Sequence, residues 1–410
     1  MEGRVFYPPI FQISQIMKKI IFLFSILSFC SCNKTKPLIA DIFSKNCVEI
    51  PVDISSPETP IMSDKLDKTF YVKLETKRES IIGFIEKVIC DDNKIFVLDK
   101  KTESVFIFDF KGKFLNKINS KGSGPKEYIF LEDFNLNKVK KRIEITDSPR
   151  MRVLFFDYRG KFIGEQKFNK RIYHYFVSNS QGEFLFHNQK ASNNSIIDHF
   201  SSKGKLLESY FKSTDHSDDY NNFIELHNPV SLMDDKMCFV LNGNEGIYAV
   251  ENDSCKELYR FVFGKNKYSD MLDEFYKTTG DDVIQNFSEK YHLPFSIENL
   301  FFGDTYFTVN MLVTPSLLCY YYNMQTGKGF LVKDWAMKGK LALIPGFTVG
   351  VNKDFFITSY ESDYFMRFYE EINRNGLKSI DPKGFNEIKN LYLQTKPEDN
   401  PILMFYQMKI

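Results

Sequence analysis

The stretch Gly122-Ser123-Gly124 begins like the glycine-rich loops that hold phosphate groups with backbone N–H groups. Such a loop needs a third glycine where Glu127 stands, and it needs a helix directly after it. No helical pattern follows, so a dinucleotide or phosphate site is not supported. The residues instead predict a tight connection between two strands, in which the glycines give backbone freedom and Pro125 gives rigidity.

Histidine and aspartate could bind a metal, but their spacing does not indicate such a site. None of the six histidines has the i, i+4 spacing of a zinc-binding helix, and His174 and His187 fall within predicted strands. The acidic residues near His216 offer oxygen ligands for calcium but lack the order of a calcium loop; they are Asp215, Asp218 and Asp219. We interpret them as a solvated loop. No G-x-S-x-G nucleophile motif occurs, and no cofactor is predicted.

Composition excludes two further classes of protein. The 54 basic and 53 acidic residues nearly balance, which argues against a nucleic-acid-binding surface. The seven cysteines form no C-x-x-C pair, so zinc and thioredoxin-like sites have no support. Buried thiols are the main interpretation, with a Cys238–Cys255 bridge between neighbouring strands left open.

The N-terminal region has the features of a lipoprotein signal. Met17-Lys18-Lys19 precedes an apolar run, Ile20 to Cys30, which is too short to span a bilayer as a helix of ~20 residues. Cys32 follows directly after Ser31, as at a bacterial lipid-attachment site. We predict that residues 1–31 are a signal peptide and that Cys32 carries the lipid. A buried core helix is the alternative interpretation.

Two other features complete this layout. Residues 1–16 do not fit a signal, so Met17 is predicted as the true start. Residues 32–68 contain several prolines, serines and threonines and little periodicity, which indicates a linker between the lipid and a domain at 69–410.

The domain is organised around Lys94–Tyr128, which holds three runs rich in Ile, Val and Phe. Gly112 lies in the turn between the last two runs and is free to adopt the positive φ of a tight hairpin. Gly160 and Gly204 occupy equivalent turns, 48 and 44 residues further along the chain. A four-strand unit that repeats at this spacing is typical of a β-propeller blade.

Six sets of strands can be assigned in this way, and the last set has only three. We predict that Phe70–Glu75 supplies its fourth strand by pairing with Ile402–Lys409, which would close the ring and remove two sheet edges. Helical insertions are expected within Gly264–Ser296 and around Phe385–Leu393. The predicted fold is therefore all-β: a six-bladed β-propeller of four-stranded antiparallel blades.

The chain resembles the six-bladed β-propeller lipoproteins of Bacteroidota, which are related to NHL-type propellers. The resemblance covers about Leu66 to the end, and the segments that carry it are Tyr71–Thr76, Lys94–Asp99, Val105–Asp109, Gly112–Phe114, Lys121–Tyr128 and Asn400–Tyr406. It implies the fold and a location in the cell envelope. It provides no catalytic residue.

We expect a lipid-anchored module that binds a protein, peptide or glycan, does not bind nucleic acid and is a monomer. A metal-dependent propeller hydrolase or lyase is the alternative. The resemblance implies that lipoproteins destined for the cell surface tend to have acidic residues just after the lipidated cysteine. Here Asn33-Lys34-Thr35-Lys36 follows Cys32, so the periplasmic side is favoured over the cell surface.

The binding face can also be predicted, because strand direction alternates within a blade. The long connections expected on one face are Asn188–Ser195, Lys212–Glu225, Gly264–Ser296, Lys333–Gly346 and Ser359–Pro401. Long insertions on one face of a repeat protein often form its binding surface. The expected contact residues on this face are Lys121, Lys126, Glu127, Tyr128 and Arg150.

Overall fold

The computed structural model describes residues 47–55, 62–172, 174–188, 195–211, 226–251, 254–269, 271, 287–314, 316–332, 347–374 and 382–409. All of them belong to one compact unit, Ile39–Ile410. The strands form one five-stranded, three four-stranded and one eight-stranded sheet, a propeller-like arrangement. Within these ranges, no helix is both long and apolar enough to cross a membrane.

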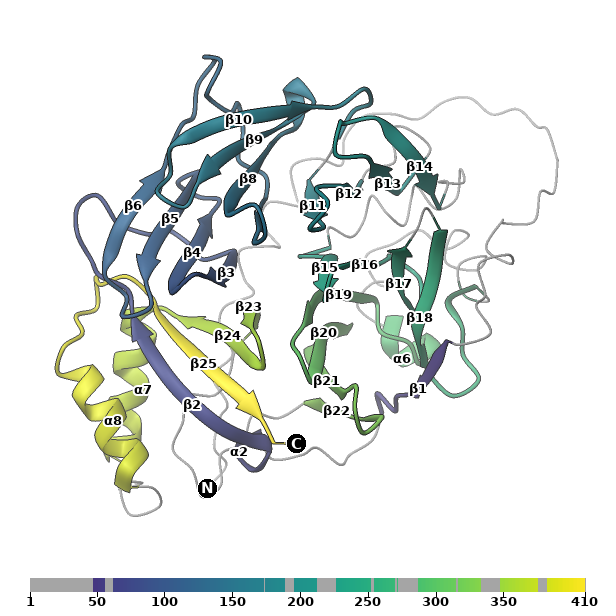
Figure 1. Cartoon of the computed structure of the whole chain (residues 1–410). Coiled ribbons are helices and arrows are strands. Elements are labelled where there is room, and N and C mark those ends of the chain that lie inside the picture. The colour runs from purple at the N-terminus through teal and green to yellow at the C-terminus, as the bar shows by residue number, and fades with distance from the viewer. Residues whose placement is uncertain are drawn as a thin grey trace, which may run out of the picture. The chain divides into compact units, whose positions relative to one another are not determined.

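Three sheets are antiparallel meanders in chain order (Figure 1). One consists of β7 (Phe134–Asn137), β8 (Arg142–Asp147), β9 (Arg152–Asp157) and β10 (Phe162–Lys167). The next consists of β11 (Tyr175–Ser178), β12 (Phe184–His187), β13 (Ile197–Phe200) and β14 (Leu206–Tyr210). The third consists of β19 (Ser296–Phe302), β20 (Tyr306–Val313), β21 (Ser316–Asn323) and β22 (Lys328–Val332).

The eight-stranded sheet is two antiparallel halves. One half is β3 (Lys87–Asp91), β4 (Lys94–Asp99), β5 (Ser104–Asp109) and β6 (Phe114–Ile118). The other is β23 (Thr348–Asn352), β24 (Phe355–Tyr360), β25 (Ile402–Met408) and β2 (Leu66–Lys73). The halves meet where β23 pairs in parallel with β3. The predicted pairing of the N-terminal strand with the C-terminal strand is present, with Phe70 opposite Phe405.

The folded unit begins earlier than predicted. The five-stranded sheet contains β15 (Val230–Met233), β16 (Lys236–Val240), β17 (Gly246–Glu251) and β18 (Ser254–Val262), and β1 (Val48–Pro51) adds to β18 in parallel (Figure 1). Ile50 of β1 is buried in the hydrophobic core. The short helix α2 (Met62–Lys65) also packs into the core through Met62. These parts of the predicted linker, 32–68, are therefore folded, because their apolar side chains find a partner sheet.

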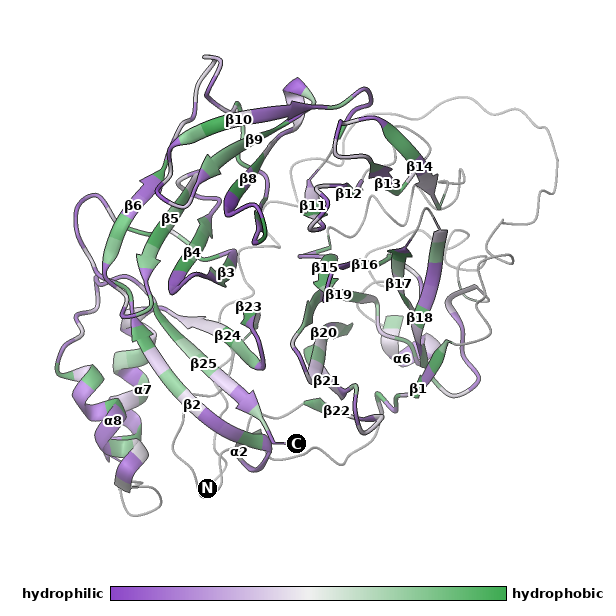
Figure 2. Cartoon of the chain, in the orientation of Figure 1, coloured by the Kyte–Doolittle hydropathy of each residue, from purple (hydrophilic) through white to green (hydrophobic). Residues whose placement is uncertain are grey.

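Apolar side chains between neighbouring sheets form the core. Between the β3–β6 and β7–β10 groups, for example, Phe96 and Ile107 pack with Phe134, Ile143 and Leu154. Figure 2 shows the hydrophobic residues concentrated along the strands, while hydrophilic residues predominate on α8. This sheet-on-sheet packing follows from the β-branched and aromatic residues of each strand.

Two helices lie between β24 and β25, α7 (Ser362–Arg374) and α8 (Pro382–Tyr392). The helix expected around Phe385–Leu393 is confirmed by α8, whereas α7 was not predicted. Phe365 of α7 and Ile388 of α8 pack against the sheet that contains β25. Within Gly264–Ser296 the structure describes α6 (Phe287–Tyr291), and residues 272–286 lie outside the described ranges.

The hairpins after the third strand of the first groups share one geometry. In the β5–β6 turn, Asp109 Oδ1 accepts the backbone N–H groups of Lys111 and Lys113, each at 2.9 Å. In the β9–β10 turn, Asp157 does the same for Arg159 and Lys161. The glycine of each turn has positive φ, +84° at Gly112, which a residue with a Cβ adopts only under strain.

Candidate functional site

Charged and amide residues recur at or near the first strand of five groups, shortly before or at the start of β3, β7, β11 and β15 and within β19. The pairs are Glu86-Lys87, Glu132-Asp133, His174-Tyr175, His227-Asn228 and Glu298-Asn299. First strands of successive groups are neighbours in space: β7 lies beside β11, β11 beside β15, β15 beside β19, and β19 beside β23. The polar pairs therefore come together, and we name Glu86, Lys87, Lys100, Glu132, Asp133, His174, Tyr175, His227 and Glu298 the mouth cluster.

A buried ion pair forms one part of the mouth cluster. Lys87 Nζ lies 2.6 Å from Asp133 Oδ1, and the Asp133 side chain is fully buried. The backbone N–H of Phe176 donates to the other carboxylate oxygen at 3.2 Å. Burial raises the pKa of Asp133, and the ammonium group of Lys87 opposes that rise. This pair joins three successive groups of strands, since Lys87, Asp133 and Phe176 belong to different ones.

A second part surrounds Glu86. Its Oε1 lies 2.9 Å from Lys100 Nζ and 3.8 Å from His227 Nδ1. Burial raises the pKa of Glu86, but the interactions with His227 and Lys100 outweigh it and bring the pKa to about 2. The interaction with Glu86 in turn raises the pKa of His227. Lys100 also lies over the ring of Tyr175, 4.8 Å from its centroid, so it is held by both a carboxylate and an aromatic face.

Acidic groups in the rest of the mouth cluster are less compensated. Glu298 is buried and accepts the backbone N–H of His227 at 3.2 Å; burial raises its pKa. Glu132 Oε1 lies 3.8 Å from His174 Nδ1. Its Oε2 is inaccessible to water and has no hydrogen-bond partner among the described residues. A buried acceptor without a donor is unfavourable, so a ligand hydroxyl or ammonium group would stabilise Glu132.

Exposed phenylalanines precede this cluster. Phe84 is 54% and Phe130 51% exposed, and each stands two residues before a glutamate of the cluster. Between each pair lies a buried aliphatic residue, Ile85 or Leu131. Both connections thus have the sequence Phe-aliphatic-Glu, with the phenylalanine ring exposed to solvent and the aliphatic side chain buried. Phe347, directly before β23, is exposed as well. Exposed aromatic rings beside convergent polar groups are typical of a binding site.

A cavity of about 580 Å³ lies between the first strands. Its lining includes Lys87, Asn135 and Asn228 at the end where the cluster lies. It also includes the turns that follow the first strands, among them Asp91–Asn93 and Gly303-Asp304, at the opposite end. Its volume is within the range of small-ligand pockets.

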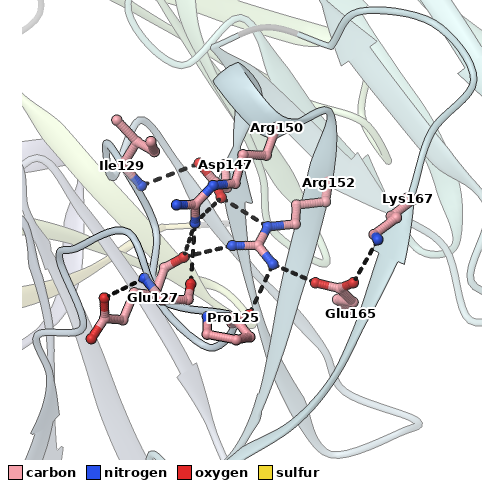
Figure 3. Close-up of polar contacts among 9 residues, drawn as sticks. Pro125, Glu127, Ile129, Asp147, Arg150, Arg152, Glu165 and Lys167 are labelled. Carbon is pink, nitrogen blue, oxygen red and sulfur yellow. Dashed lines mark hydrogen bonds and ion pairs between the residues drawn. The ribbon is translucent and has the colours of Figure 1, made fainter.

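The predicted contact residues occupy a different place. Lys121–Tyr128 forms a compact loop between β6 and β7, in which Lys121 bridges to Tyr128. Arg150 lies in a short 3-10 helix, Ser148–Arg150, and donates to the carbonyl of Glu127 at 2.8 Å (Figure 3). Arg152 donates to the same carbonyl and to Asp147 (Figure 3). These arginines hold the loop closed, so the glycines serve a tight connection, as predicted.

Two predicted contacts need correction. Tyr128 is fully buried, and its hydroxyl donates to the Glu103 carbonyl at 2.6 Å, so it cannot touch a ligand directly. Arg150 donates from its guanidinium to the backbone of the loop and keeps only 25% of its side chain exposed, so a contact role would have to compete with these hydrogen bonds. The Glu127 carboxylate accepts the Gly124 N–H. Lys121 and Lys126 are exposed, as a contact role requires.

Other predictions are resolved or fall outside the structure. Cys238 and Cys255 are free, and burial raises the pKa of both thiols to about 12. No group of three His, Cys, Asp or Glu that could hold a metal occurs in the part of the chain that the structure describes. Cys32, the acidic loop Asp215–Asp219 and most of the long connections lie outside the described residues.

The sequence analysis missed the mouth cluster, although a signal existed. The metal sites considered from the sequence use histidine or aspartate, whereas this register mixes Glu and His. The common feature is an acid or histidine near the start of five first strands, before β3, β7, β11 and β15 and within β19. The repeated Phe-aliphatic-Glu of Phe84–Glu86 and Phe130–Glu132 marks it most clearly.

The chain matches one family model and is similar in structure to several solved proteins. The model of a family described as "Domain of unknown function (DUF4934)" matches residues 45–407. A protein of Bacteroides fragilis described as exported is similar in structure, with TM-score 0.67 and 16% identity, over 89% of this chain and 100% of that one. No curated protein matches.

Two further solved structures are similar more distantly. A member of the DUF4221 family from Bacteroides vulgatus has TM-score 0.46 and 10% identity, over 84% of this chain and 97% of its own. A streptogramin B lyase has TM-score 0.42 and 11% identity, over 71% of this chain and 80% of its own.

Proposed function

We propose that this chain, which belongs to the DUF4934 family of unknown function, is a six-bladed β-propeller of the bacterial cell envelope that binds a ligand at the mouth cluster without catalysing a reaction. The six blades are the three meanders, β15–β18, and the two halves of the eight-stranded sheet. The parallel pairing of β23 with β3 brings the last group beside the first, which supports a closed ring.

The location rests on the signal and on a structural relative. The relative from Bacteroides fragilis is described as exported. The apolar run before Cys32 is consistent with export and lipid attachment. We therefore propose that Cys32 is acylated and that the domain faces the periplasm. Mass spectrometry of the mature N-terminus should find a diacylated or triacylated Cys32. An unmodified Cys32, or membrane fractionation that survives Cys32→Ala, would contradict the anchor.

A single observation carries the binding role: the mouth cluster combines exposed phenylalanines with an unpaired carboxylate oxygen. The ring of Phe84 or Phe130 would pack against an apolar face, such as a sugar ring or a hydrophobic side chain. The Glu132 side chain is 22% exposed, so rotation of its carboxylate would bring the buried Oε2 to a ligand hydroxyl or ammonium group, from which it would accept a hydrogen bond. A glycan or a peptide carries both features. The alternative of a metal-dependent hydrolase or lyase has no supporting observation among the described residues.

A microarray of bacterial envelope glycans and of peptides tests this role. The double variant Phe84→Ala, Phe130→Ala and the single variant Glu132→Gln should weaken each signal at least about tenfold, as loss of an interface anchor does. The matched control is Lys111→Ala, Arg159→Ala, at hairpins of the opposite end, which should bind an uncharged ligand like the wild type. Equal losses in the mouth and control variants would overturn the assignment.

A further inference from the structure

Five turns of the first three groups carry a concentration of positive charge. They are residues 91–94, 109–113, 138–141, 157–161 and 201–205, and nine of their side chains are exposed lysines or arginines: Lys111, Lys113, Lys138, Lys140, Lys141, Arg159, Lys161, Lys203 and Lys205. We name these nine the basic turn patch. The turns contact one another, because the Phe110 N–H donates to the Asn93 carbonyl and the Tyr158 hydroxyl donates to Asp91. Lys141 pairs with Asp91, which joins turn 138–141 to the others. Turn 201–205 is reached through Gly182, which has both Lys140 and Ser202 beside it, so the five turns form one surface with Gly182 between the last two.

The acidic residues in these turns do not neutralise it. Only four aspartates occur there against the nine exposed cations, and all four have partners within the turns; Asp92 lies 3.3 Å from Lys94. Asp109 and Asp157 accept backbone N–H groups of their own turns. Asp91 pairs with Lys141 and accepts from Tyr158. The patch ends at Asp235 of the following group, which accepts from Ser180.

An apolar residue stands within the positive charge. Val139, between Lys138 and Lys140, is 71% exposed, the largest exposure of any hydrophobic side chain among the described residues. Lysines flanking an exposed aliphatic side chain suit the boundary between lipid headgroups and acyl chains. A soluble polyanion would use the lysines but not Val139.

The direction of β1 agrees with this placement. β1 runs parallel to β18, with Val48 opposite Tyr259. The N-terminal end of β1 therefore points toward the start of β18, the end at which the β17–β18 turn lies. That turn follows a third strand, like the turns of the basic turn patch. The 16 residues from Cys32 to Val48 reach at most about 55 Å when extended, so a lipid on Cys32 keeps the domain close to the bilayer.

We propose that the basic turn patch lies on an anionic phospholipid surface and that the mouth cluster consequently faces away from the membrane. This orientation rests on the anchor proposed for Cys32. The lipid confines the domain to the bilayer, and the patch selects which end of the strands meets it. Such an interaction is electrostatic, so salt weakens it.

Lysine footprinting of the full-length lipidated protein tests the orientation. The protein is reconstituted into vesicles of phosphatidylcholine, with or without phosphatidylglycerol, floated on a density gradient and acylated with a water-soluble amine reagent. With phosphatidylglycerol, labelling of Lys138, Lys140, Lys203 and Lys205 should fall at least about fivefold and recover in high salt. Lys121 and Lys126, on the loop face, should label equally in all samples. Lys138→Glu, Lys140→Glu should abolish protection of Lys203, whereas the matched pair Lys121→Glu, Lys126→Glu should leave it unchanged.

Each remaining outcome decides a different point. If the protein floats with both vesicle types but the patch labels as it does without vesicles, the orientation is wrong and the anchor stands. If the protein fails to float with phosphatidylcholine vesicles alone, the anchor is wrong. In that case, flotation and protection of the patch with phosphatidylglycerol vesicles would still support the role of the basic turn patch. Their absence would refute that role. Protection by soluble dextran sulfate but not by phosphatidylglycerol vesicles would assign the patch to an anionic glycan and overturn the proposal.

Discussion

Neighbouring groups of strands are joined differently in the two halves of the chain. In the first half, a hairpin glycine meets the outer strand of the preceding group: Gly112 meets β2, Gly160 meets β6 and Gly204 meets β10. A Cβ at Gly112 or Gly204 would overlap a backbone carbonyl, that of Lys73 or Lys167. In the second half, the equivalent Gly327 has no neighbour from another group within reach of a Cβ.

In the second half aromatic side chains join the groups where the hairpin glycine does not, although Gly303 in another turn lies against the Lys353 carbonyl. Tyr259 of β18 lies 5.0 Å from Phe307 of β20, measured between ring centroids. Tyr321 of β21 lies 5.5 Å from Phe356 of β24, and its hydroxyl is 2.9 Å from that of Tyr406. Aromatic packing tolerates many combinations of side chains, whereas a backbone-to-backbone contact tolerates only glycine.

Removing the last strand should have the largest effect. A chain that ends at Asn400 lacks β25, which lies between β2 and β24 and buries six of its seven residues. We expect insoluble or unfolded protein, since two new sheet edges would be exposed. Circular dichroism during heating provides the measurement, and a chain that ends at Met408 is the control. A shortened protein that melts cooperatively would show that the groups are held together without β25.

Glycine substitution should separate the two kinds of junction. Gly112→Ala and Gly204→Ala combine a strained positive φ with a backbone clash, so each should lower the free energy of unfolding by about 4 kcal/mol. Gly327→Ala has the strain alone and should cost about 1 kcal/mol. Gly160→Ala should fall between them, because only side chains of Asn116 and Ile118 stand nearby. Urea unfolding measures the free energy of unfolding of all four variants. Equal losses would show that the hairpin glycines of the two halves do not differ in their contacts.

This difference explains how far the sequence could predict the fold. The spacing of Gly112, Gly160 and Gly204 is visible because each position demands one residue type. The group β15–β18 lacks such a glycine, so its sequence pattern is weaker, although all four strands are present. The helix α7 and the strand β1 were missed because their stability comes from burial against distant parts of the chain, Phe365 beside the β25 sheet and Ile50 in the β18 core.

The site was harder to predict than the fold. Lys121 and Lys126 are exposed as expected. The Tyr128 hydroxyl and the Arg150 guanidinium instead donate hydrogen bonds to backbone carbonyls of the protein. Sequence shows that an arginine can bind a ligand but not that the carbonyl of Glu127 already accepts its hydrogen bond. The mouth cluster depends on bringing five connections together, so its members become recognisable only after the register of every first strand is known.

Acid should weaken the junction between β12 and β16. His187 is buried, and its Nε2 donates to the Val240 carbonyl at 3.1 Å. Burial lowers its pKa to about 4, below the unfolded value near 6.5. The neutral form therefore contributes stability above pH 6.5, and this contribution is lost as the pH falls toward 4. The loss should reach about 3 kcal/mol at pH 4.

His187→Gln isolates this contribution, because its amide can still donate to Val240 and does not titrate. Urea unfolding at several pH values should show a flatter profile between pH 6.5 and 4 than in the wild type. Identical profiles would mean that other groups cause the acid sensitivity. This junction joins the first and second halves of the chain. The result therefore also shows how strongly the stability of one half depends on its contact with the other.

The smallest effect should come from the hydroxyl groups that join β21 and β25. Tyr406 Oη lies 2.9 Å from Tyr321 Oη and 3.0 Å from Thr348 Oγ1. Tyr321→Phe leaves Tyr406 bonded to Thr348 and should cost about 0.5–1 kcal/mol. Tyr406→Phe removes both hydrogen bonds and leaves the buried Tyr321 hydroxyl without its partner, so about 2 kcal/mol is expected. The double variant should cost less than the sum, because it removes the orphaned hydroxyl as well. Strict additivity in urea unfolding would show that the two hydroxyls do not interact, and the aromatic junction would then depend on ring packing alone.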